Sequence, residues 1–210
     1  MDNIYFLNNI SISSRNAQLQ NITLEIKVGD FLIIKGQNAS GKSLLLKLFY
    51  LKVLPFSGDL YLKGNKVSRY SKKQIIEFRK RMGVILQNDY LIPFFSVYQN
   101  IQLANQIQNS KNNFSKRMDE ISEWLELEKI KNEKIINLSN SQKQKVVIAR
   151  ALINNPSVIV ADQPETFLDE KSIKKFFFLL ESLSKIGVTI ILTSNNNKEI
   201  NVKHKMLELG

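Results

Sequence analysis

Four short apolar segments predict buried β-strands. They span Phe31–Ile34, Val84–Leu86, Val158–Ala161 and Val188–Leu192. Each is almost continuous in hydrophobic residues and rich in β-branched ones, which is typical of strands covered on both faces of a parallel sheet. Helical patterns lie between several of them, at Ser43–Val53 and Val146–Ile153. This alternation predicts an α/β fold with a parallel sheet.

Two further regions differ from this alternation. Near the N-terminus, "NIYFLNNISI", "LQNITLEI" and "GDLYLKG" are separated by turn-forming residues and predict antiparallel strands. Between about residues 88 and 137 the strand patterns are absent, and Met118, Ile121, Trp124 and Leu125 recur at helical spacing. We therefore expect an antiparallel β subdomain and a helical insertion, in which Trp124 packs the insertion rather than stacking on a ligand.

Composition narrows the class of protein without identifying its chemistry. The 210 residues suit one domain spanning residues 1–210, and the absence of cysteine excludes disulfide and thiolate chemistry. No apolar run reaches the roughly 18–20 residues that cross a bilayer, and the first residues lack a signal-peptide pattern, so we expect a cytoplasmic protein. The net charge of +11 comes from lysines along the whole chain rather than from a basic stripe interleaved with aromatics. We expect no nucleic-acid partner and a mild attraction to acidic lipids.

The stretch "FLIIKGQNASGKSLLLKLF" carries the strongest chemical signal. A predicted strand leads into the spacing Gly-x-x-x-x-Gly-Lys-Ser and then into a predicted helix, which is the context of a P-loop. Backbone N–H groups of such a loop surround phosphate oxygens, the lysine reaches the β- and γ-phosphates, and the serine hydroxyl binds Mg²⁺. The predicted nucleotide-binding residues are Gly36, Gln37, Asn38, Ala39, Ser40, Gly41, Lys42, Ser43 and Leu44. Asp162, at the end of a predicted buried strand, would hold the Mg²⁺ through water.

A longer stretch narrows the class of P-loop protein. The segment "NLSNSQKQKVVIARALINNPSVIVADQPETFLDE" resembles the run from signature motif to D-loop in ATP-binding cassette (ABC) proteins, and "GVILQND" resembles their Q-loop. The resemblance covers essentially the whole chain. It implies a P-loop nucleotide-binding domain whose helical subdomain follows the Q-loop, with ATP and Mg²⁺ as cofactors. It also implies that Gln87 is a catalytic and metal-site residue, and that Ser139 contacts nucleotide.

Within that family, "FRKRMGVILQNDYLIPFFSVYQNI" and the ending "KMLELG" resemble most closely the FtsE group of cell-division ATP-binding proteins. This resemblance implies a homodimer, or a pairing with another ABC subunit, that encloses ATP. It implies an integral membrane partner, either FtsX-like or a permease, and a position at the inner face of the cell membrane. ATPases of lipoprotein release and macrolide export share the pattern, so an active transporter ATPase is the alternative.

The chain departs from the family pattern at four places. Gln163 stands at the position of the catalytic glutamate, and Asn195 at that of the switch histidine. Asn140 and Ser141 replace both signature glycines, and Ile12 falls near the position of the aromatic residue that stacks on adenine. These departures favour a module that binds ATP and hydrolyses it slowly, because an amide can orient water but cannot take its proton.

Four further residues bear on this expectation. Ser141 and Gln144 have the spacing of a capping box, which would begin a helix at the signature motif. Glu165 is the one local carboxylate that could replace the missing base, although a surface or D-loop role is the more ordinary one. His204 is the only histidine and precedes a predicted terminal strand, where we expect a surface residue rather than a displaced switch.

Overall fold

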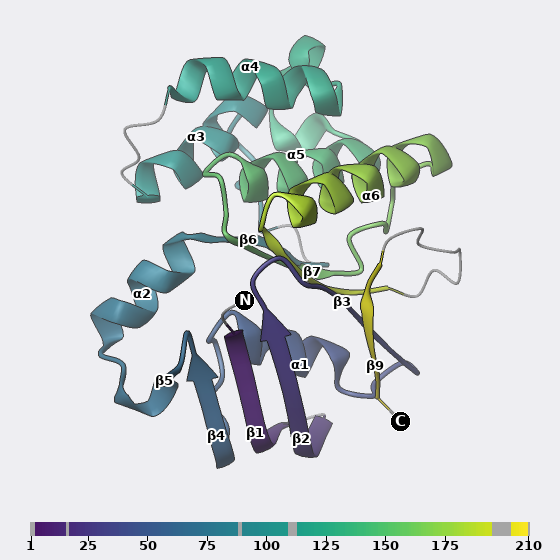
Figure 1. Cartoon of the computed structure of the whole chain (residues 1–210). Helices are drawn as coiled ribbons and strands as arrows, with labels where there is room; N and C mark the ends of the chain where they lie inside the picture. The colour runs from purple at the N-terminus through teal and green to yellow at the C-terminus, as the bar shows by residue number, and fades with distance from the viewer. Residues whose placement is uncertain (1–2, 16, 88–89, 109–112, 195–202, 210) are drawn as a thin grey trace.

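The computed structural model describes residues 3–15, 17–87, 90–108, 113–194 and 203–209 (Figure 1). The strands are β1 (Asn3–Ser14), β2 (Ala17–Lys27), β3 (Phe31–Gly36), β4 (Ser57–Leu62), β5 (Asn65–Lys66), β6 (Met82–Ile85), β7 (Val158–Asp162), β8 (Thr189–Thr193) and β9 (Lys205–Leu209). The α-helices are α1 (Lys42–Phe49), α2 (Lys72–Lys80), α3 (Val97–Gln108), α4 (Phe114–Leu125), α5 (Asn140–Leu152) and α6 (Glu170–Lys185). Short 3₁₀ turns are η1 (Val67–Arg69), η2 (Glu128–Ile130) and η3 (Ile135–Asn137).

Two sheets organise the described residues. The larger one is parallel throughout, with the strand order β6-β7-β8-β3-β9, and the smaller one is antiparallel, with the order β2-β1-β4-β5. All four predicted buried strands belong to the parallel sheet, and the N-terminal segments form the antiparallel one. The expected α/β class with an antiparallel part and a helical part is therefore confirmed.

The parallel sheet separates two hydrophobic cores, which explains its nearly continuous apolar strands. Alternate residues along each strand point to opposite faces. On one face, Leu32 and Ile34 of β3 pack with α1 and the antiparallel sheet. On the other face, Phe31 and Ile33 pack with the layer formed by α3, α4, α5 and α6 (Figure 1). Helix α1 thus lies between the two sheets and fixes the loop that precedes it.

The helical insertion occurs where the sequence predicted it, as α3, α4 and the two 3₁₀ turns that follow. Met118 and Leu125 of α4 are buried, and Ile121 and Trp124 pack partly buried against the same core. The Lys175 Nζ lies 5.1 Å from the centroid of the Trp124 ring. The expected packing role of Trp124 is therefore confirmed.

Helices α2 and α6 were not predicted as such. Helix α2 begins with a capping box between Ser71 and Gln74. None of its side chains is fully buried, and most of them are polar. Helix α6 starts at an N-cap formed by Asp169, whose side chain accepts from the Ser172 N–H at 2.8 Å. None of the helices among the described residues combines the length and apolarity needed to cross a bilayer.

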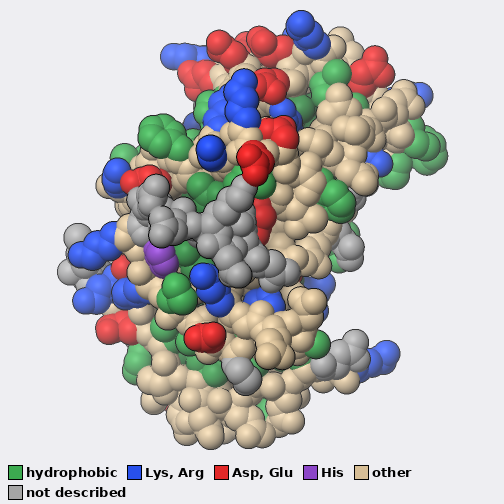
Figure 2. Space-filling view, turned by 90° about the vertical axis from the view of Figure 1, so that its right-hand side faces the viewer, with side chains coloured by type: hydrophobic (Ala, Val, Ile, Leu, Met, Phe, Trp, Pro, Cys, Tyr) green, Lys and Arg blue, Asp and Glu red, His purple; other side chains and the backbone are tan. Residues whose placement is uncertain are grey.

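Charged side chains are dispersed over the surface in Figure 2. Lys and Arg side chains lie among acidic and uncharged ones on this face and form no continuous basic stripe. Several lysines pair with carboxylates, including Lys205 with Asp30 at 2.6 Å and Lys145 with Glu126 at 2.8 Å. The absence of a nucleic-acid partner stays a prediction.

Candidate functional site

The segment between β3 and α1 approaches other parts of the chain so closely that glycine is needed twice. A Cβ atom at Gly36 would lie 2.4 Å from the carbonyl oxygen of Leu209. A Cβ atom at Gly41 would lie 2.8 Å from Cδ2 of Leu19, and the φ angle of Gly41 is +93°, in the left-handed region. The two glycines of the predicted motif therefore bound a tight loop that opens directly into the N-terminus of α1.

Lys42, the first residue of α1, turns its side chain back into this loop. Its Nζ donates to the carbonyl oxygen of Gly36 at 2.6 Å and to that of Gln37 at 2.7 Å. The residue is only 6% exposed. A buried ammonium, loop N–H groups and a helix N-terminus converge here, which is the combination that holds phosphate oxygens.

A cavity of about 360 Å³ lies over this loop. Most of the predicted nucleotide-binding residues line it, and so do Gln87 and Gln163. The lining consists of Asn38, Ala39, Gly41, Lys42, Ser43, Leu44, Gln87 and Gln163, together with Ser14, Ala17 and Lys47. Gly36, Gln37 and Ser40 shape the loop without lining the cavity. The last three lining residues were not predicted, because they come from the tip of the first hairpin and the second turn of α1.

Asp162 ends β7 at the carboxyl edge of the parallel sheet, as predicted. It is 7% exposed, and its Oδ1 accepts a hydrogen bond from the Thr193 Oγ1 of neighbouring β8 at 2.7 Å. The described residues contain no cluster of three or more His, Cys, Asp or Glu side chains that could hold a metal by themselves. Oxygen donors from Ser43, Gln87 and Asp162 nevertheless suit Mg²⁺, which typically takes one or two carboxylates, waters and substrate phosphates.

Gln163 holds an unusual backbone conformation at the mouth of the cavity. Its φ angle is +47°, a conformation that non-glycine residues adopt uncommonly and often at functional sites. Its N–H donates both to the Thr193 carbonyl oxygen at 3.2 Å and to the Thr193 Oγ1 at 3.0 Å. The backbone is thus fixed by β8, and Gln163 lines the same cavity as Ser43. An amide at this place orients water but does not ionise.

Glu165 does not line the cavity. It is half-buried, and its Oε1 accepts a hydrogen bond from the Ser194 Oγ at 2.6 Å. The carboxylate therefore joins the turn after β7 to the end of β8, which is a structural use of this side chain. Asn195, the predicted replacement of the switch histidine, lies outside the described residues.

The signature helix begins two residues earlier than the predicted capping box. Ser139, not Ser141, is the N-cap of α5: its Oγ accepts from the Gln142 N–H at 3.2 Å, and the Gln142 side chain accepts from the Ser139 N–H at 2.9 Å. Gln144 is instead buried and donates from Nε2 to the Pro164 carbonyl oxygen at 2.8 Å. The prediction failed because both serines have a glutamine three residues later, and burial of Gln144 selected the first pair.

The position assigned to Ile12 was also wrong. Ile12 is 1% exposed, packs in the core and pairs with Leu19 across the hairpin of β1 and β2. Ser14, two residues further on the same face of β1, lines the cavity in its place, with Ala17 across the turn. Strand alternation could have indicated Ser14. Residues two apart share a face of a strand, and of Ile12 and Ser14 only Ser14, nearer the end of β1, reaches the cavity.

Comparison with known proteins decides among the P-loop classes. A sequence model described as "ABC transporter" matches residues 19–166. The chain belongs to the ABC transporter family. Lys42, Gln87 and all of α5 lie within the matched residues.

Individual ABC proteins resemble the chain over most of its length. The methionine import ATP-binding protein MetN of Francisella tularensis is 37% identical over 97% of this chain, which spans only 57% of that protein. The cell division ATP-binding protein FtsE of Streptococcus pneumoniae is 29% identical over 91% of this chain and 84% of its own length. The dimeric structure of MJ0796, a bacterial ABC transporter cassette, aligns with a TM-score of 0.81 and 30% identity, covering 91% of this chain and 88% of that one. The same cassette has also been solved with ADP and Pi.

Proposed function

We propose that this chain is the ATP-binding subunit of an FtsE-like membrane complex, that two subunits close on MgATP, and that hydrolysis is impaired. One observation carries the proposal. Lys42 and Ser43 of the P-loop line the same cavity as Gln163, so that phosphate-binding groups are present and the carboxylate of the family pattern is not.

Binding follows from the groups around Lys42. The two carbonyl oxygens that accept from its Nζ would give way to β- and γ-phosphate oxygens, which form stronger, charge-assisted bonds. Ser43, at the first turn of α1, supplies a hydroxyl for the metal, and Asp162 supplies a carboxylate behind it. When bound, Mg²⁺ neutralises phosphate charge.

A second subunit would complete the site. Ser139 is exposed at the N-terminus of α5, and the first N–H groups of that helix carry partial positive charge. Asn140 and Ser141 replace small glycines there, yet the helix terminus itself is regular. This end of α5 is therefore suited to face a phosphate held by the other subunit, either an identical chain or a paired ABC subunit. The MJ0796 cassette has been solved as a dimer.

Slow hydrolysis follows from the chemistry at Gln163. A positioned general base contributes about 10²–10⁴-fold, or roughly 3–5 kcal/mol of barrier. Gln163 supplies orientation without proton transfer. Glu165 does not compensate in this arrangement, because its carboxylate lies outside the cavity and is bonded to Ser194.

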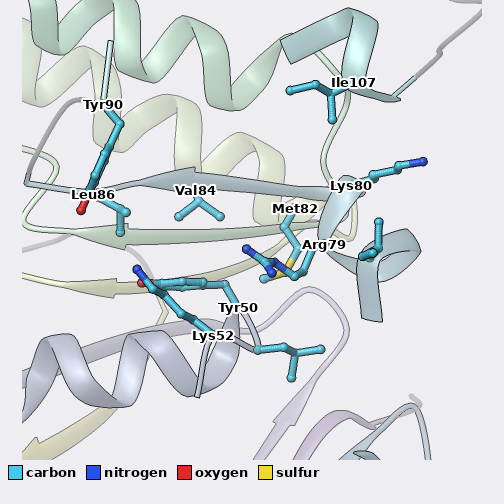
Figure 3. A pocket seen from close by; sticks show the side chains of 11 residues that line it. Tyr50, Lys52, Arg79, Lys80, Met82, Val84, Leu86, Tyr90 and Ile107 are labelled. Carbon is cyan, nitrogen blue, oxygen red and sulfur yellow. The ribbon is translucent and has the colours of Figure 1, made fainter. Parts of the chain in front are cut away.

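The groove in Figure 3 is the proposed docking surface for the membrane partner. It encloses about 690 Å³ beside the segment that follows Gln87. Met82, Val84 and Leu86 form a row along β6, with Tyr50 and Tyr90 on either side (Figure 3). Its other lining residues are Leu51, Lys52, Ile76, Arg79, Lys80 and Ile107. An apolar floor with a basic rim suits an amphipathic helix that carries acidic residues.

This groove adjoins the nucleotide cavity in the chain, since Leu86 lines the groove and the next residue, Gln87, lines the cavity. Burial raises the pKa of Tyr50, which also lines the groove. The same segment presents Phe94, which is 71% exposed. Asn100 fixes that segment through hydrogen bonds with the N–H of Ile92 at 2.8 Å and the carbonyl oxygen of Ser96 at 3.0 Å. Exposed aromatics on a fixed segment are typical of a surface made for a partner.

The FtsE-like assignment rests on the motif around the Q-loop and on the near-complete coverage of the FtsE protein. The alternative is an active ATPase of a transport complex. The higher identity to a methionine import protein supports it, and ATPases of the lipoprotein-release or export type are of this kind. Both assignments share ATP, a second ABC subunit and a membrane partner, and they differ in whether turnover is fast.

Calorimetry with MgATP tests the binding half of the proposal. Wild type should bind in the micromolar-to-millimolar range. Lys42→Ala should weaken binding by roughly 10–100-fold, since hydrogen bonds to charged groups contribute about 1.5–3 kcal/mol. Lys52→Ala removes a lysine from the docking groove. It is the matched control and should leave the MgATP affinity unchanged. Equal affinity in wild type and Lys42→Ala would refute the site. Rapid single-turnover hydrolysis would instead support the active-ATPase alternative.

A further inference from the structure

One side of helix α2 combines an exposed apolar residue with basic neighbours. Ile76 is 52% exposed, whereas Ile75 and Phe78 of the same helix pack partly buried against the core. Residues three and four positions away are the neighbours of Ile76 on the helix surface. All four of these neighbours are basic, namely Lys72, Lys73, Arg79 and Lys80. Helix α2 therefore presents an apolar side chain with cations before and after it.

The stretch around α2 has few acidic residues to neutralise this charge. Residues 66–81 hold seven lysines and arginines and a single acidic residue, Glu77. Lys80 pairs with Glu77 at 2.9 Å, and Lys66 pairs with Asp59 at 2.5 Å. In the described part of the chain, no ion pair is formed by the remaining five, which are Arg69, Lys72, Lys73, Arg79 and Arg81. An exposed pair such as Lys80 with Glu77 contributes little, so Lys80 is available to a second anion.

Helix α2 borders the proposed docking groove at one side of the molecule (Figure 1). Ile76, Arg79 and Lys80 line that groove. Figure 3 shows that Arg79 turns toward Tyr50 within the groove, whereas Lys80 points away from it. The dispersed charges in Figure 2 belong to another face, since α2 lies on the side turned away from the viewer there. A membrane protein docked in the groove would bring this outer side of α2 to the bilayer surface.

We propose that the outer side of α2 binds the headgroups of anionic phospholipids, with Lys72, Lys73 and Lys80 as the cationic contacts and Ile76 entering the headgroup layer. The lysine stems would lie along the Ile76 side chain while their ammonium groups reach the phosphates. Clusters of basic residues on an amphipathic helix are typical of such binding, and each residue is worth about fivefold in affinity. The inference rests on the proposed function, because the membrane partner supplies the nearby bilayer.

Co-sedimentation of the unmodified chain with lipid vesicles, without nucleotide or partner, tests the inference. Vesicles of phosphatidylcholine with about 30% phosphatidylserine should retain the chain, and vesicles of phosphatidylcholine alone should not. Raising the salt concentration from about 0.1 M to 1 M should release the chain, because the Debye length falls from about 10 Å to 3 Å. Absence of retention on the anionic vesicles at the lower salt concentration would overturn the proposal.

Variants of α2 locate the binding surface. Lys72→Gln with Lys73→Gln and Lys80→Gln should weaken binding to the anionic vesicles about tenfold or more. It should leave MgATP affinity unchanged, since none of the three residues lines the nucleotide cavity. Glu77→Gln should strengthen vesicle binding, because it removes the carboxylate that pairs with Lys80 and repels lipid phosphates. Weaker binding in Glu77→Gln would contradict the orientation of this surface.

A second triple variant separates α2 from the net charge of the whole chain. Lys171→Gln with Lys174→Gln and Lys185→Gln removes three exposed lysines from α6, and should weaken vesicle binding by less than about threefold. Equal losses in the two triple variants would overturn the assignment to α2 and attribute binding to the net charge of +11. Tighter binding to duplex DNA than to the anionic vesicles, lost in the α2 variant, would overturn the choice of lipid as the ligand.

The apolar contact has its own test. Ile76→Ser should weaken vesicle binding about threefold or more, whereas Ile186→Ser, at a residue that is 78% exposed after α6, should not. An unchanged affinity in Ile76→Ser would overturn the entry of Ile76 into the headgroup layer. Failure of the proposed function is distinguishable, because the vesicles contain neither partner nor nucleotide. Loss of MgATP binding or of partner co-purification would leave vesicle binding in place, and loss of vesicle binding would leave both of them in place.

Discussion

Gln163→Glu replaces the side-chain amide by a carboxylate of nearly the same shape, and so restores a group that can accept a proton. The φ angle of +47° and both hydrogen bonds of the Gln163 N–H to Thr193 involve only the backbone, so Gln163→Glu should keep them. The new carboxylate would adjoin Asp162, and this like charge raises its pKa toward the range in which a general base works best. If the missing base alone limits turnover, hydrolysis should rise by about one to three decades, or roughly 1.4–4 kcal/mol of barrier.

Steady-state and single-turnover ATPase rates, measured with the membrane partner in lipid vesicles, report this gain. Gln163→Glu with Asn195→His should exceed the product of the single effects, because groups that act on one γ-phosphate act as a unit. Glu165→Gln is the control. It weakens the hydrogen bond from Ser194, and it should leave the ATPase rate unchanged because Glu165 does not act as the base. Brisk wild-type hydrolysis that is insensitive to Glu165→Gln would refute the reasoning. An unaltered rate in Gln163→Glu with retained ATP binding would refute it as well.

Two further predictions concern the docking surface and the fold. Phe94→Asp with Phe95→Asp, on the exposed segment that follows the groove residue Tyr90, should abolish co-purification of the membrane partner and leave MgATP affinity unchanged; unaltered co-purification would count against this segment as part of the docking surface. Gln144→Leu should destabilise the fold by about 1–3 kcal/mol, because it leaves the buried Pro164 carbonyl oxygen without its donor. The thermal midpoint should fall by roughly 2–12 °C, whereas Lys143→Leu at the neighbouring, less buried position should change it little.

The sequence predicted the parallel sheet well because its strands are buried on both faces. Their nearly continuous hydrophobic runs can therefore be recognised from the local sequence alone. The P-loop was predictable for a related reason: Gly36 is required by the close Leu209 carbonyl oxygen and Gly41 by its left-handed backbone, and the motif spacing records both glycines directly. Helix α2 escaped prediction because it is short and mostly polar, and only Ile75 and Phe78 pack partly buried against the core.

The finer features of the site depend on contacts between distant segments. The choice of Ser139 over Ser141 as N-cap was settled by Gln144 reaching Pro164, twenty residues along the chain. The role of Ser14 was hidden because its neighbour Ile12, on the same strand face, lies in the core. Local patterns gave equal support to both members of each pair, and only tertiary burial separated them.

Helix α5 connects the three surfaces that the proposed function requires. Its N-terminus at Ser139 is the end suited to face the second subunit. One turn later, Gln144 donates to the carbonyl oxygen of Pro164, directly after Gln163. In its last turns, Arg150 donates from Nη1 to the carbonyl oxygen of Tyr90, which lines the docking groove, at 2.9 Å. We expect α5 to move as one rigid element, so that closure on ATP would reach the docking groove through these two hydrogen bonds without hydrolysis. A slow catalytic site is compatible with such coupling, because the signal requires binding energy and not the breaking of a phosphate bond.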